Sequence, residues 1–296
     1  MRAPVAEGPI HSTLLIQFIE SHRQLFVLTG AGCSTESGIP DYRDAEGNWK
    51  GTARPMTLQT FMSDESARRR YWARSLLGWQ RFGAARPNAA HRAIAQLQRQ
   101  GRIAGLVTQN VDGLHQAAGS SGVIDLHGRL DRVRCMQCER RISRDEQQRH
   151  LLEHNPAWHA RIAEHAAERL RDDARDRPDG DVDLPSEETA QFKVPACAAC
   201  GGILKPDVVF FGESVPPARV AAAREQLQCA DAMLVVGSSL MLYSGFRFAQ
   251  YAAELGKPIA AINLGRTRAD ELLALKVARP CASSLRRVLE SASCAA

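Results

Sequence analysis

The chain has 296 residues, of which 44% are hydrophobic and 24% charged, with 22 Gly and 14 Pro. This balance is typical of a folded globular chain and excludes a collagen-like or wholly disordered one. The formal net charge of +5 is small for this length, so charge alone does not indicate a nucleic-acid-binding protein. The longest apolar runs, such as 232–236, are far shorter than the roughly 18 residues needed to cross a bilayer.

The N-terminal residues do not have the composition of a secretory signal. Residues 1–12 include Pro4, Glu7, Gly8 and Pro9, where such a signal has an unbroken apolar stretch. We therefore expect a cytoplasmic protein whose eight cysteines stay reduced. Reduced cysteines favour metal binding or catalysis over a disulfide framework.

Four short apolar runs each lead into a polar turn, and amphipathic segments separate them. The runs are residues 25–29, 103–108, 232–236 and 259–262, and the helical segments are 14–20, 91–99, 219–228 and 244–255. Continuous apolar strands that alternate with helices predict an α/β fold, with a parallel sheet covered by helices on both faces. Such sheets bind ligands beyond the carboxyl ends of their strands, where the four polar turns fall.

One stretch between the second and third runs differs in composition from the rest. Residues 139–193 are rich in Arg, Asp, Glu and His and contain no run typical of a buried strand, so we expect helices and loops there. We predict a small module of residues 134–205, inserted into a larger domain formed by residues 12–133 and 206–290.

Each end of this module carries a C-x2-C motif, Cys135 with Cys138 and Cys197 with Cys200. Two such motifs can place four thiolates around one ion, which is the tetrahedral shell that structural zinc prefers. That shell leaves no open position for a reactive water. A redox role is disfavoured because redox C-x-x-C motifs occur singly. We predict one structural Zn²⁺ bound by these four cysteines.

The first apolar run is followed by Gly30-Ala31-Gly32-Cys33-Ser34. A glycine-rich turn after a strand can aim backbone N–H groups at a pyrophosphate. The third glycine of the dinucleotide-binding pattern G-x-G-x-x-G is missing, which disfavours an ordinary dehydrogenase. A plain tight turn remains the alternative for these glycines.

Four further motifs, together with the glycine loop, resemble those of the sirtuins, the NAD-dependent protein lysine deacylases. They are Ile39–Arg43, Gln109–Asp112, Leu126–Gly128 and Gly237–Ser239. The stretches Ser34–Arg43, Arg70–Arg74, Pro206–Gly212 and Tyr243–Gly245 resemble in particular the class II, sirtuin 4-like branch. The resemblance covers residues 14–281, and Gly265 stands where many other sirtuins carry an acidic residue.

The resemblance implies an inverted Rossmann domain with a zinc-ribbon module and, between them, a cleft in which NAD and an acyl-lysine peptide meet. It implies an enzyme that removes acyl groups from lysine side chains of proteins and releases nicotinamide and O-acyl-ADP-ribose. NAD is then a consumed cosubstrate, and no hydride moves. The expected cofactors are NAD and one Zn²⁺, and the expected partners are acylated proteins, with neither a membrane nor nucleic acid.

The resemblance also implies roles for matching residues. His127 is the expected general base for a ribose hydroxyl and Asn110 the second catalytic residue, although a lone His is more often structural. The residues expected to contact NAD are Gly30, Ala31, Gly32, Ser34, Tyr42, Arg43, Gln109, Asn110, Asp112, Gly237, Ser238, Ser239, Asn263, Leu264, Gly265 and Cys281. Those expected to contact the peptide or its acyl group are Val209, Phe210, Phe211, Gly212, Glu213, Tyr71 and Arg74.

Tyr71 and Arg74 form a Tyr-x-x-Arg pair in a predicted helix, as in sirtuins that remove acidic acyl groups. Side chains three residues apart share a helix face, and a guanidinium binds a carboxylate bidentately. Simpler interpretations stay open. Arg74 is also compatible with a solvated helix face, Phe210 and Phe211 with the core, and residues 109–112 with a solvated turn.

Two other functions remain open at this stage. A mono-ADP-ribosyltransferase would use the same NAD pocket but let a protein nucleophile trap C1′ of the ribose. A zinc-ribbon protein that binds nucleic acid would need stacking aromatic residues and a basic groove, whereas aromatic residues make up only 6% of the chain.

Overall fold

The computed structural model describes residues 10–50, 55–169, 184 and 187–293. Its larger part is built on a parallel sheet with the strand order β3-β2-β1-β7-β8-β9. The strands are β1 (Leu25–Thr29), β2 (Ile103–Thr108), β3 (Ile124–Asp125), β7 (Ala232–Val236), β8 (Ile259–Ile262) and β9 (Leu275–Val277). The four predicted runs are therefore neighbouring strands, and their polar turns meet along one edge of the sheet.

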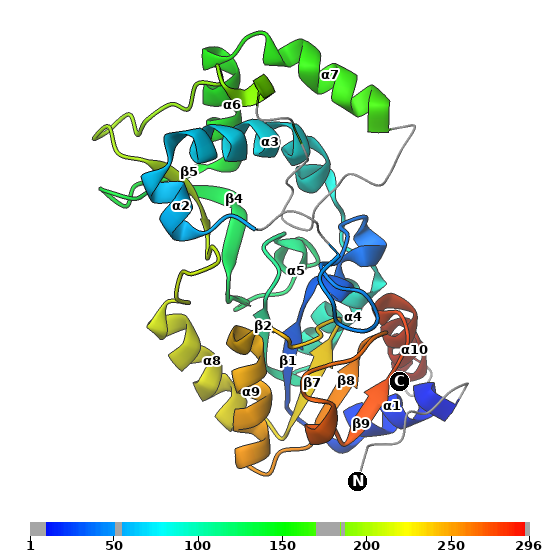
Figure 1. Cartoon of the computed structure of the whole chain (residues 1–296). Coiled ribbons are helices and arrows are strands. Elements are labelled where there is room, and N and C mark those ends of the chain that lie inside the picture. The colour runs from blue at the N-terminus through cyan, green and yellow to red at the C-terminus, as the bar shows by residue number, and fades with distance from the viewer. Residues whose placement is uncertain (1–9, 51–54, 170–183, 185–186, 294–296) are drawn as a thin grey trace.

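Helices cover both faces of this sheet, as predicted (Figure 1). One face carries α1 (Ile10–Ser21), α4 (Ala89–Arg99) and α10 (Cys281–Ser293), and the other carries α8 (Pro217–Cys229) and α9 (Tyr243–Glu254). Within β1, Leu25 and Val27 pack toward the first set and Phe26 and Leu28 toward the second. A strand buried on both faces needs apolar residues throughout, which is why the predicted runs show no polar alternation.

The smaller part contains an antiparallel sheet with the order β5-β4-β6. Its elements are β4 (Gly128–Cys135), β5 (Arg141–Ser143), β6 (Leu204–Val208), α6 (Arg144–His154) and α7 (Trp158–Arg169). The expectation of helices and loops within 139–193 omitted β5, whose exposed Arg141 and Ser143 give it no apolar signal. Part of that range, residues 170–183 and 185–186, lies outside the described residues.

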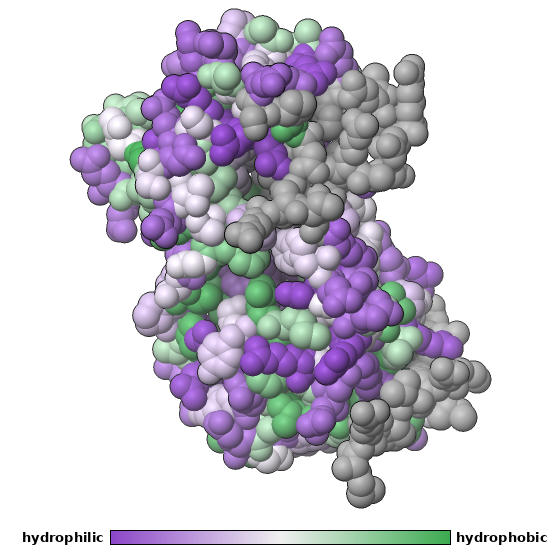
Figure 2. Space-filling model, in the orientation of Figure 1, coloured by the Kyte–Doolittle hydropathy of each residue, from purple (hydrophilic) through white to green (hydrophobic). Residues whose placement is uncertain are grey.

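Helices α2 (Leu58–Ser63) and α3 (Glu65–Ala84) pack against this smaller part, although they precede it in sequence by many residues (Figure 1). The buried ring of Trp72 donates a hydrogen bond to the carbonyl of Leu204 at 3.3 Å. The guanidinium of Arg144 lies 5.5 Å from the Trp72 ring centre and 5.0 Å from that of Trp79. The molecule narrows between its two parts (Figure 2).

Short elements occupy the connections. They are the 3₁₀ turns at Ala31–Cys33, Thr35–Ser37, Glu187–Thr189 and Asp270–Leu272, and the helix α5 (Leu114–Ala117). No helix among the described residues is long and apolar enough to cross a membrane.

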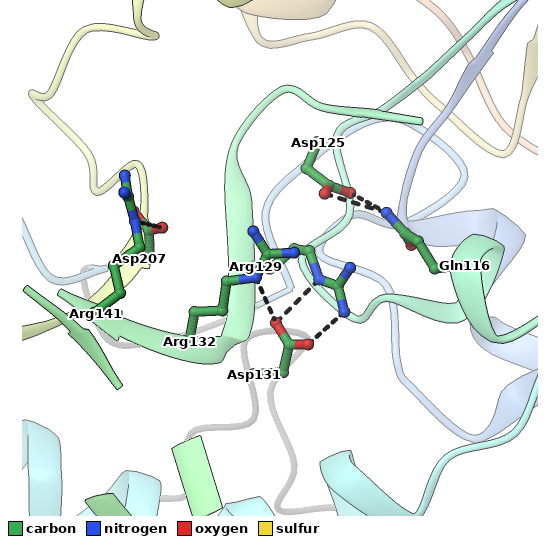
Figure 3. Close-up of polar contacts among 7 residues, drawn as sticks. All are labelled: Gln116, Asp125, Arg129, Asp131, Arg132, Arg141 and Asp207. Carbon is green, nitrogen blue, oxygen red and sulfur yellow. Dashed lines mark hydrogen bonds and ion pairs between the residues drawn. The ribbon is translucent and has the colours of Figure 1, made fainter. Parts of the chain in front are cut away.

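Strand β4 connects the two parts, and charged side chains on β4 and on its neighbouring strands form ion pairs (Figure 3). Arg129 and Asp131 form an ion pair along the strand, and Arg132 Nε lies 3.8 Å from Asp131 Oδ1. From the neighbouring strands, Arg141 Nε lies 3.1 Å from Asp207 Oδ2. Partly exposed pairs of this kind add little stability, so the register of the sheet depends mainly on its backbone ladder.

Candidate active site

A cavity of about 940 Å³ lies at the carboxyl ends of the central strands, between the two parts of the molecule. Every residue that the sequence analysis assigned to catalysis, NAD or the acyl peptide lines it. On the NAD side these are Gly30, Ala31, Gly32, Ser34, Tyr42, Arg43, Gln109, Asn110, Asp112, Gly237, Ser238, Ser239, Asn263, Leu264, Gly265 and Cys281. The others are His127, Tyr71, Arg74, Val209, Phe210, Phe211, Gly212 and Glu213.

The glycine loop packs directly on the turn after β7. A Cβ atom on Gly30 would lie 2.7 Å from Ser238 Cβ, and one on Gly32 would lie 3.0 Å from the carbonyl oxygen of Gly237. Gly237 itself has a φ of +63°, a conformation that disfavours larger residues. The two turns therefore form one wall of the cavity. These glycines lack side chains, which leaves backbone groups facing the cavity, where a dinucleotide could approach them closely.

The turn after β2 is tied to the glycine loop by hydrogen bonds. Asn110 Nδ2 donates to the carbonyl of Gly30 and to Ser34 Oγ, each at 3.0 Å. Ser34 Oγ donates to Asp112 Oδ2 at 2.7 Å. Burial raises the pKa of Asp112 above its ordinary value. These residues are not a solvated turn, because their side chains join two loops within the site.

His127 lies between β3 and β4 with hydrogen-bond partners at both ring nitrogens. Nδ1 is 2.9 Å from the carbonyl oxygen of Gln109, and Nε2 is 2.8 Å from Ser244 Oγ. Burial is the main cause that lowers the pKa of His127 to about 4. Gly128 turns the chain at a φ of +84°, where a Cβ would lie 2.0 Å from the Asp207 carbonyl oxygen. At neutral pH the ring is uncharged and able to accept a proton.

The segment after β6 forms the opposite wall. Val209 N donates to the carbonyl of His127 at 2.8 Å, and the carbonyl of Phe211 accepts from Leu58 N at 3.0 Å. Glu213 holds the turn, since its carboxylate accepts from Phe210 N at 2.9 Å and lies 3.0 Å from Lys205 Nζ. The backbone of this segment is fixed from both sides.

The two phenylalanines of this segment differ in exposure. Phe210 is 8% exposed and packs edge-on against Phe61 and Tyr71, so the core interpretation holds for it. Phe211 is 41% exposed and meets Trp49 at a ring-centre distance of 6.0 Å. The Phe211 ring therefore offers more surface than the Phe210 ring to a ligand in the cavity.

Helix α3 supplies the Tyr-x-x-Arg pair. Tyr71 is 6% exposed, with its ring centre 5.4 Å from that of Phe61. Arg74 follows one turn later, is half-buried and reaches the same cavity. The pair therefore shares a face directed toward the site, and a fully solvated position is excluded for Arg74.

Residues 41–50 border the NAD side. The rings of Tyr42 and Trp49 stack at 5.1 Å, and Arg43 Nη1 donates to the carbonyl of Gly47 at 2.8 Å. Gly265 contacts this segment so closely that a Cβ would lie 2.4 Å from the carbonyl oxygen of Ala45. The close packing explains why a residue with a side chain is excluded at position 265.

The remaining NAD-side residues lie at the ends of β8 and β9. Asn263 Nδ2 donates to the carbonyl of Gly265 at 3.0 Å, and Leu264 is 65% exposed. Cys281, the first residue of α10, is buried, with its Sγ 3.8 Å from the carbonyl oxygen of Ile262.

The four predicted cysteine ligands lie together in the smaller part, away from the cavity. Sγ of Cys135 is 3.5 Å from Sγ of Cys200, and Sγ of Cys138 is 3.8 Å from Sγ of Cys197. Four thiolates at about 2.3 Å from one Zn²⁺ in a tetrahedron are about 3.8 Å apart. The separations fit one structural zinc, and the fourth ligand leaves no position for a substrate.

A second cluster, Cys33, His91 and His115, lies buried beneath the glycine loop. The backbone N–H of Asn88 donates to His91 Nδ1 at 3.3 Å, which leaves the proton of that ring on Nε2, the atom facing Cys33. His115 Nε2 is bonded to Thr29 Oγ1 at 2.9 Å. These hydrogen bonds join uncharged side chains into a network that supports the glycine loop.

Ser244 and Arg247 are among the residues of the cavity wall to which the sequence analysis assigned no role. The stretch Tyr243–Gly245 carries part of the resemblance, but its contact with His127 bridges 117 positions in sequence. The i, i+3 spacing of Ser244 and Arg247 on α9 is the signal that could have placed these two residues on one helix face.

A parallel sheet with a glycine loop and a cavity at its carboxyl edge is the arrangement typical of nucleotide-binding α/β proteins. The Sir2 family model matches residues 30–244. The chain belongs to this family, the sirtuins.

Relatives with assigned names resemble nearly the whole chain. It is 59% identical over 281 residues to NAD-dependent protein deacetylase 2 of Bradyrhizobium diazoefficiens, covering 95% of this chain and 98% of that protein. It is 50% identical over 289 residues to NAD-dependent protein deacetylase 1 of Streptomyces coelicolor, covering 97% and 93%.

Solved structures share the fold. A Sir2 homolog–NAD complex matches with a TM-score of 0.72 at 27% identity, over 100% of this chain and 97% of that one. A Sir2–p53 peptide–NAD⁺ complex matches with a TM-score of 0.71 at 27% identity, over 95% and 98%. The α/β prediction with an inserted zinc-binding module is confirmed.

Proposed function

We propose that this protein is an NAD-dependent protein lysine deacylase that also binds one structural zinc. The observation that carries the proposal is the position of His127. Its uncharged ring lines a cavity that has the glycine loop on one wall and the fixed 209–212 segment on the other. The names of the relatives and the ligands in the solved sirtuin structures support the same activity.

In the reaction that we propose, the acyl oxygen of the substrate lysine attacks C1′ of the nicotinamide ribose as nicotinamide leaves. His127 then takes a proton from a ribose hydroxyl, which attacks the acyl carbon. Water then hydrolyses the resulting intermediate, and the products are free lysine, nicotinamide and O-acyl-ADP-ribose. A base that is neutral at working pH and within reach of the ribose suits this step.

We assign the residues of one cavity wall to NAD and those of the opposite wall to the acylated peptide. The glycine loop and the turns after β2, β7 and β8 hold NAD, and Asn110 orients the nicotinamide ribose beside His127. The peptide pairs by its backbone with residues 209–212, so that sequence around the lysine varies freely while the acyl pocket sets selectivity.

Within the family we propose the class II, sirtuin 4-like branch. The support is Gly265, which the packing of Ala45 requires, and the Tyr243–Gly245 motif beside His127. We further propose that Arg74 receives the distal carboxylate of an acidic acyl group, with Tyr71 beside it. The half-buried setting of Arg74 at the cavity wall supports this role.

We retain residues 134–205 as the proposed zinc module and residues 12–133 and 206–290 as the proposed NAD-binding domain, with α2 and α3 packed on the former. The compartment we propose is the cytoplasm, because thiolate ligands need a reducing environment. We propose no role for nucleic acid.

The test is to incubate the purified protein with NAD and a panel of acylated peptides, and to identify the products by mass spectrometry. We expect free lysine peptide, nicotinamide and O-acyl-ADP-ribose in equal amounts. ADP-ribose attached to protein, without loss of the acyl group, would identify a mono-ADP-ribosyltransferase instead. The peptide without its acyl group is the control and should consume no NAD.

A further inference from the structure

Both ring nitrogens of His127, a residue of the cavity wall, are hydrogen-bonded in the free protein. Its Nδ1 lies 2.9 Å from a backbone carbonyl oxygen, that of Gln109, which can only accept. Nδ1 therefore carries the ring proton, and Nε2 carries the lone pair. Ser244 Oγ lies 2.8 Å from Nε2, so its hydroxyl donates to that lone pair.

The start of α9 is built to bring Ser244 to this position. Ser244 is the second residue of the helix and lines the same cavity as His127. The next residue, Gly245, packs on the Gln109 side chain, where an added Cβ would lie 2.5 Å from Nε2 of Gln109. A larger residue at position 245 would have to displace the Gln109 side chain, whose own backbone carbonyl binds Nδ1 of His127.

The ring of His127 is in surroundings that oppose its protonation. Burial is the largest cause of its lowered pKa, and the positive charges of Arg219 on α8 and Arg247 on α9 act in the same direction. A protonated ring at this place needs a hydrogen-bond acceptor at Nε2. Ser244 Oγ is a neutral acceptor at the required distance, and a hydrogen bond from a cationic donor is roughly twice as strong as one between neutral groups.

We propose that Ser244 is a positioning residue for His127, whose hydroxyl changes from donor to acceptor as the base takes up its proton. The inference rests on the proposed function. Before the transfer, Ser244 donates to Nε2 and fixes the ring. Nε2 has one lone pair, so Ser244 first rotates its own hydrogen away and keeps it. The ribose hydroxyl then gives its proton to Nε2, with one O–H bond broken and one N–H bond formed, and Ser244 accepts from the new N–H.

The test compares Ser244→Ala with Ser244→Thr, which keeps the hydroxyl, and with Ser21→Ala, an exposed serine at the end of α1. For Ser244→Ala we expect kcat to fall about 10-fold, the size of one hydrogen bond to a charged group. The KM values for NAD and peptide should stay within about twofold, since substrate binding is not the step affected. The midpoint of the acidic limb of the kcat profile should move to lower pH, and Ser244→Thr should restore both rate and midpoint.

A Ser244→Ala protein with the wild-type kcat and an unchanged acidic limb would overturn the inference. So would a loss of rate that Ser244→Thr fails to restore although its melting temperature and NAD affinity equal those of the wild type. The failure of the proposed function is distinguishable, because it would appear in the wild type itself as a lack of O-acyl-ADP-ribose. Ser21→Ala should equal the wild type in every measurement.

Discussion

At the scale of single residues, the ring of His127 is held in one orientation and still lies at the wall of the cavity. Hydrogen bonds at both ring nitrogens fix its orientation, while its edge remains at the cavity wall. Its lowered pKa follows mainly from burial, so the base is uncharged throughout the neutral range. Protonating the buried ring costs free energy, and a hydrogen bond from the charged ring to an acceptor such as Ser244 Oγ offsets part of that cost.

Replacing His127 by Ala should remove the base while leaving the NAD walls intact. We expect kcat for deacylation to fall by about 10²–10⁴-fold, with NAD affinity retained. Single-turnover kinetics and calorimetric NAD binding measure the two quantities. His159→Ala, an exposed histidine of α7, is the matched control. Retention of more than about half of the wild-type rate at saturating substrate would contradict the assignment of the base.

Arg74→Ala should change acyl selectivity more than overall activity. If Arg74 binds a distal carboxylate, kcat/KM for glutaryl-lysine or methylglutaryl-lysine exceeds that for acetyl-lysine, and the substitution lowers the acidic-to-acetyl ratio by about 10-fold or more. Arg74→Lys should recover only part of the ratio, since an ammonium group cannot bind bidentately.

The matched control is Arg70→Ala, one turn earlier on α3, because Arg70 pairs weakly with Asp64 at 3.9 Å and does not line the cavity. A wild-type preference for acetyl-lysine, or an acidic-to-acetyl ratio that stays the same in Arg74→Ala, would show that this role is wrong.

What the sequence could indicate about single residues depended on whether their signal is local. The glycines at 30 and 32 lie in one short motif after a strand, so a close-approach loop was predictable. The contact between Ser244 and His127 was not, since the two residues are 117 positions apart and meet only through the order of the strands.

At the scale of elements, burial on both faces made the sheet strands predictable. The predicted runs match the bounds of β1, β2, β7 and β8, because such strands are apolar throughout. The strand β5 and the attachment of α2 and α3 to the smaller part were missed. Their contacts join residues such as Trp72 and Leu204, which no local pattern connects.

The zinc site should decide whether the smaller part folds. Cys197→Ala removes one of four thiolates, and we expect loss of bound zinc, a lower melting temperature and loss of activity, since structural zinc contributes directly to folding. Atomic absorption and thermal unfolding measure these effects. Cys229→Ala, an exposed cysteine at the end of α8, should keep one zinc per chain. A fully active Cys197→Ala protein without metal would show that the site is dispensable.

At the scale of the whole molecule, the cavity has two walls that fold from different parts of the chain. One wall, the turns of the parallel sheet, was predictable because the carboxyl ends of parallel strands share an edge. The other wall contains α3 and the 209–213 segment, and its place depends on the packing of two bodies. Residue-by-residue resemblance, and not periodicity, indicated that it belonged to the site.

The buried histidines make the whole fold sensitive to acid. His91 and His115 are 0% and 1% exposed, and burial lowers the pKa of both, that of His91 to about 4. Below an unfolded-state pKa of about 6.5 the unfolded chain takes up protons that the native rings refuse, so stability is lost as the pH falls from about 6.5 toward 4. For His91 alone the loss is roughly 2 kcal/mol at pH 5, from 1.36 kcal/mol per unit.

Urea unfolding between pH 7.5 and 5 measures this slope, with bound zinc determined at each pH because protonated thiols also release the metal. His91→Asn should flatten the slope, whereas the exposed His159→Gln should not. Burial raises the pKa of Asp112 and of Asp125, which opposes the effect, but mainly nearer their ordinary value of 3.8. A free energy of unfolding that stays constant from pH 7 to 5, with zinc retained, would mean that these rings are hydrated or charged in the native protein.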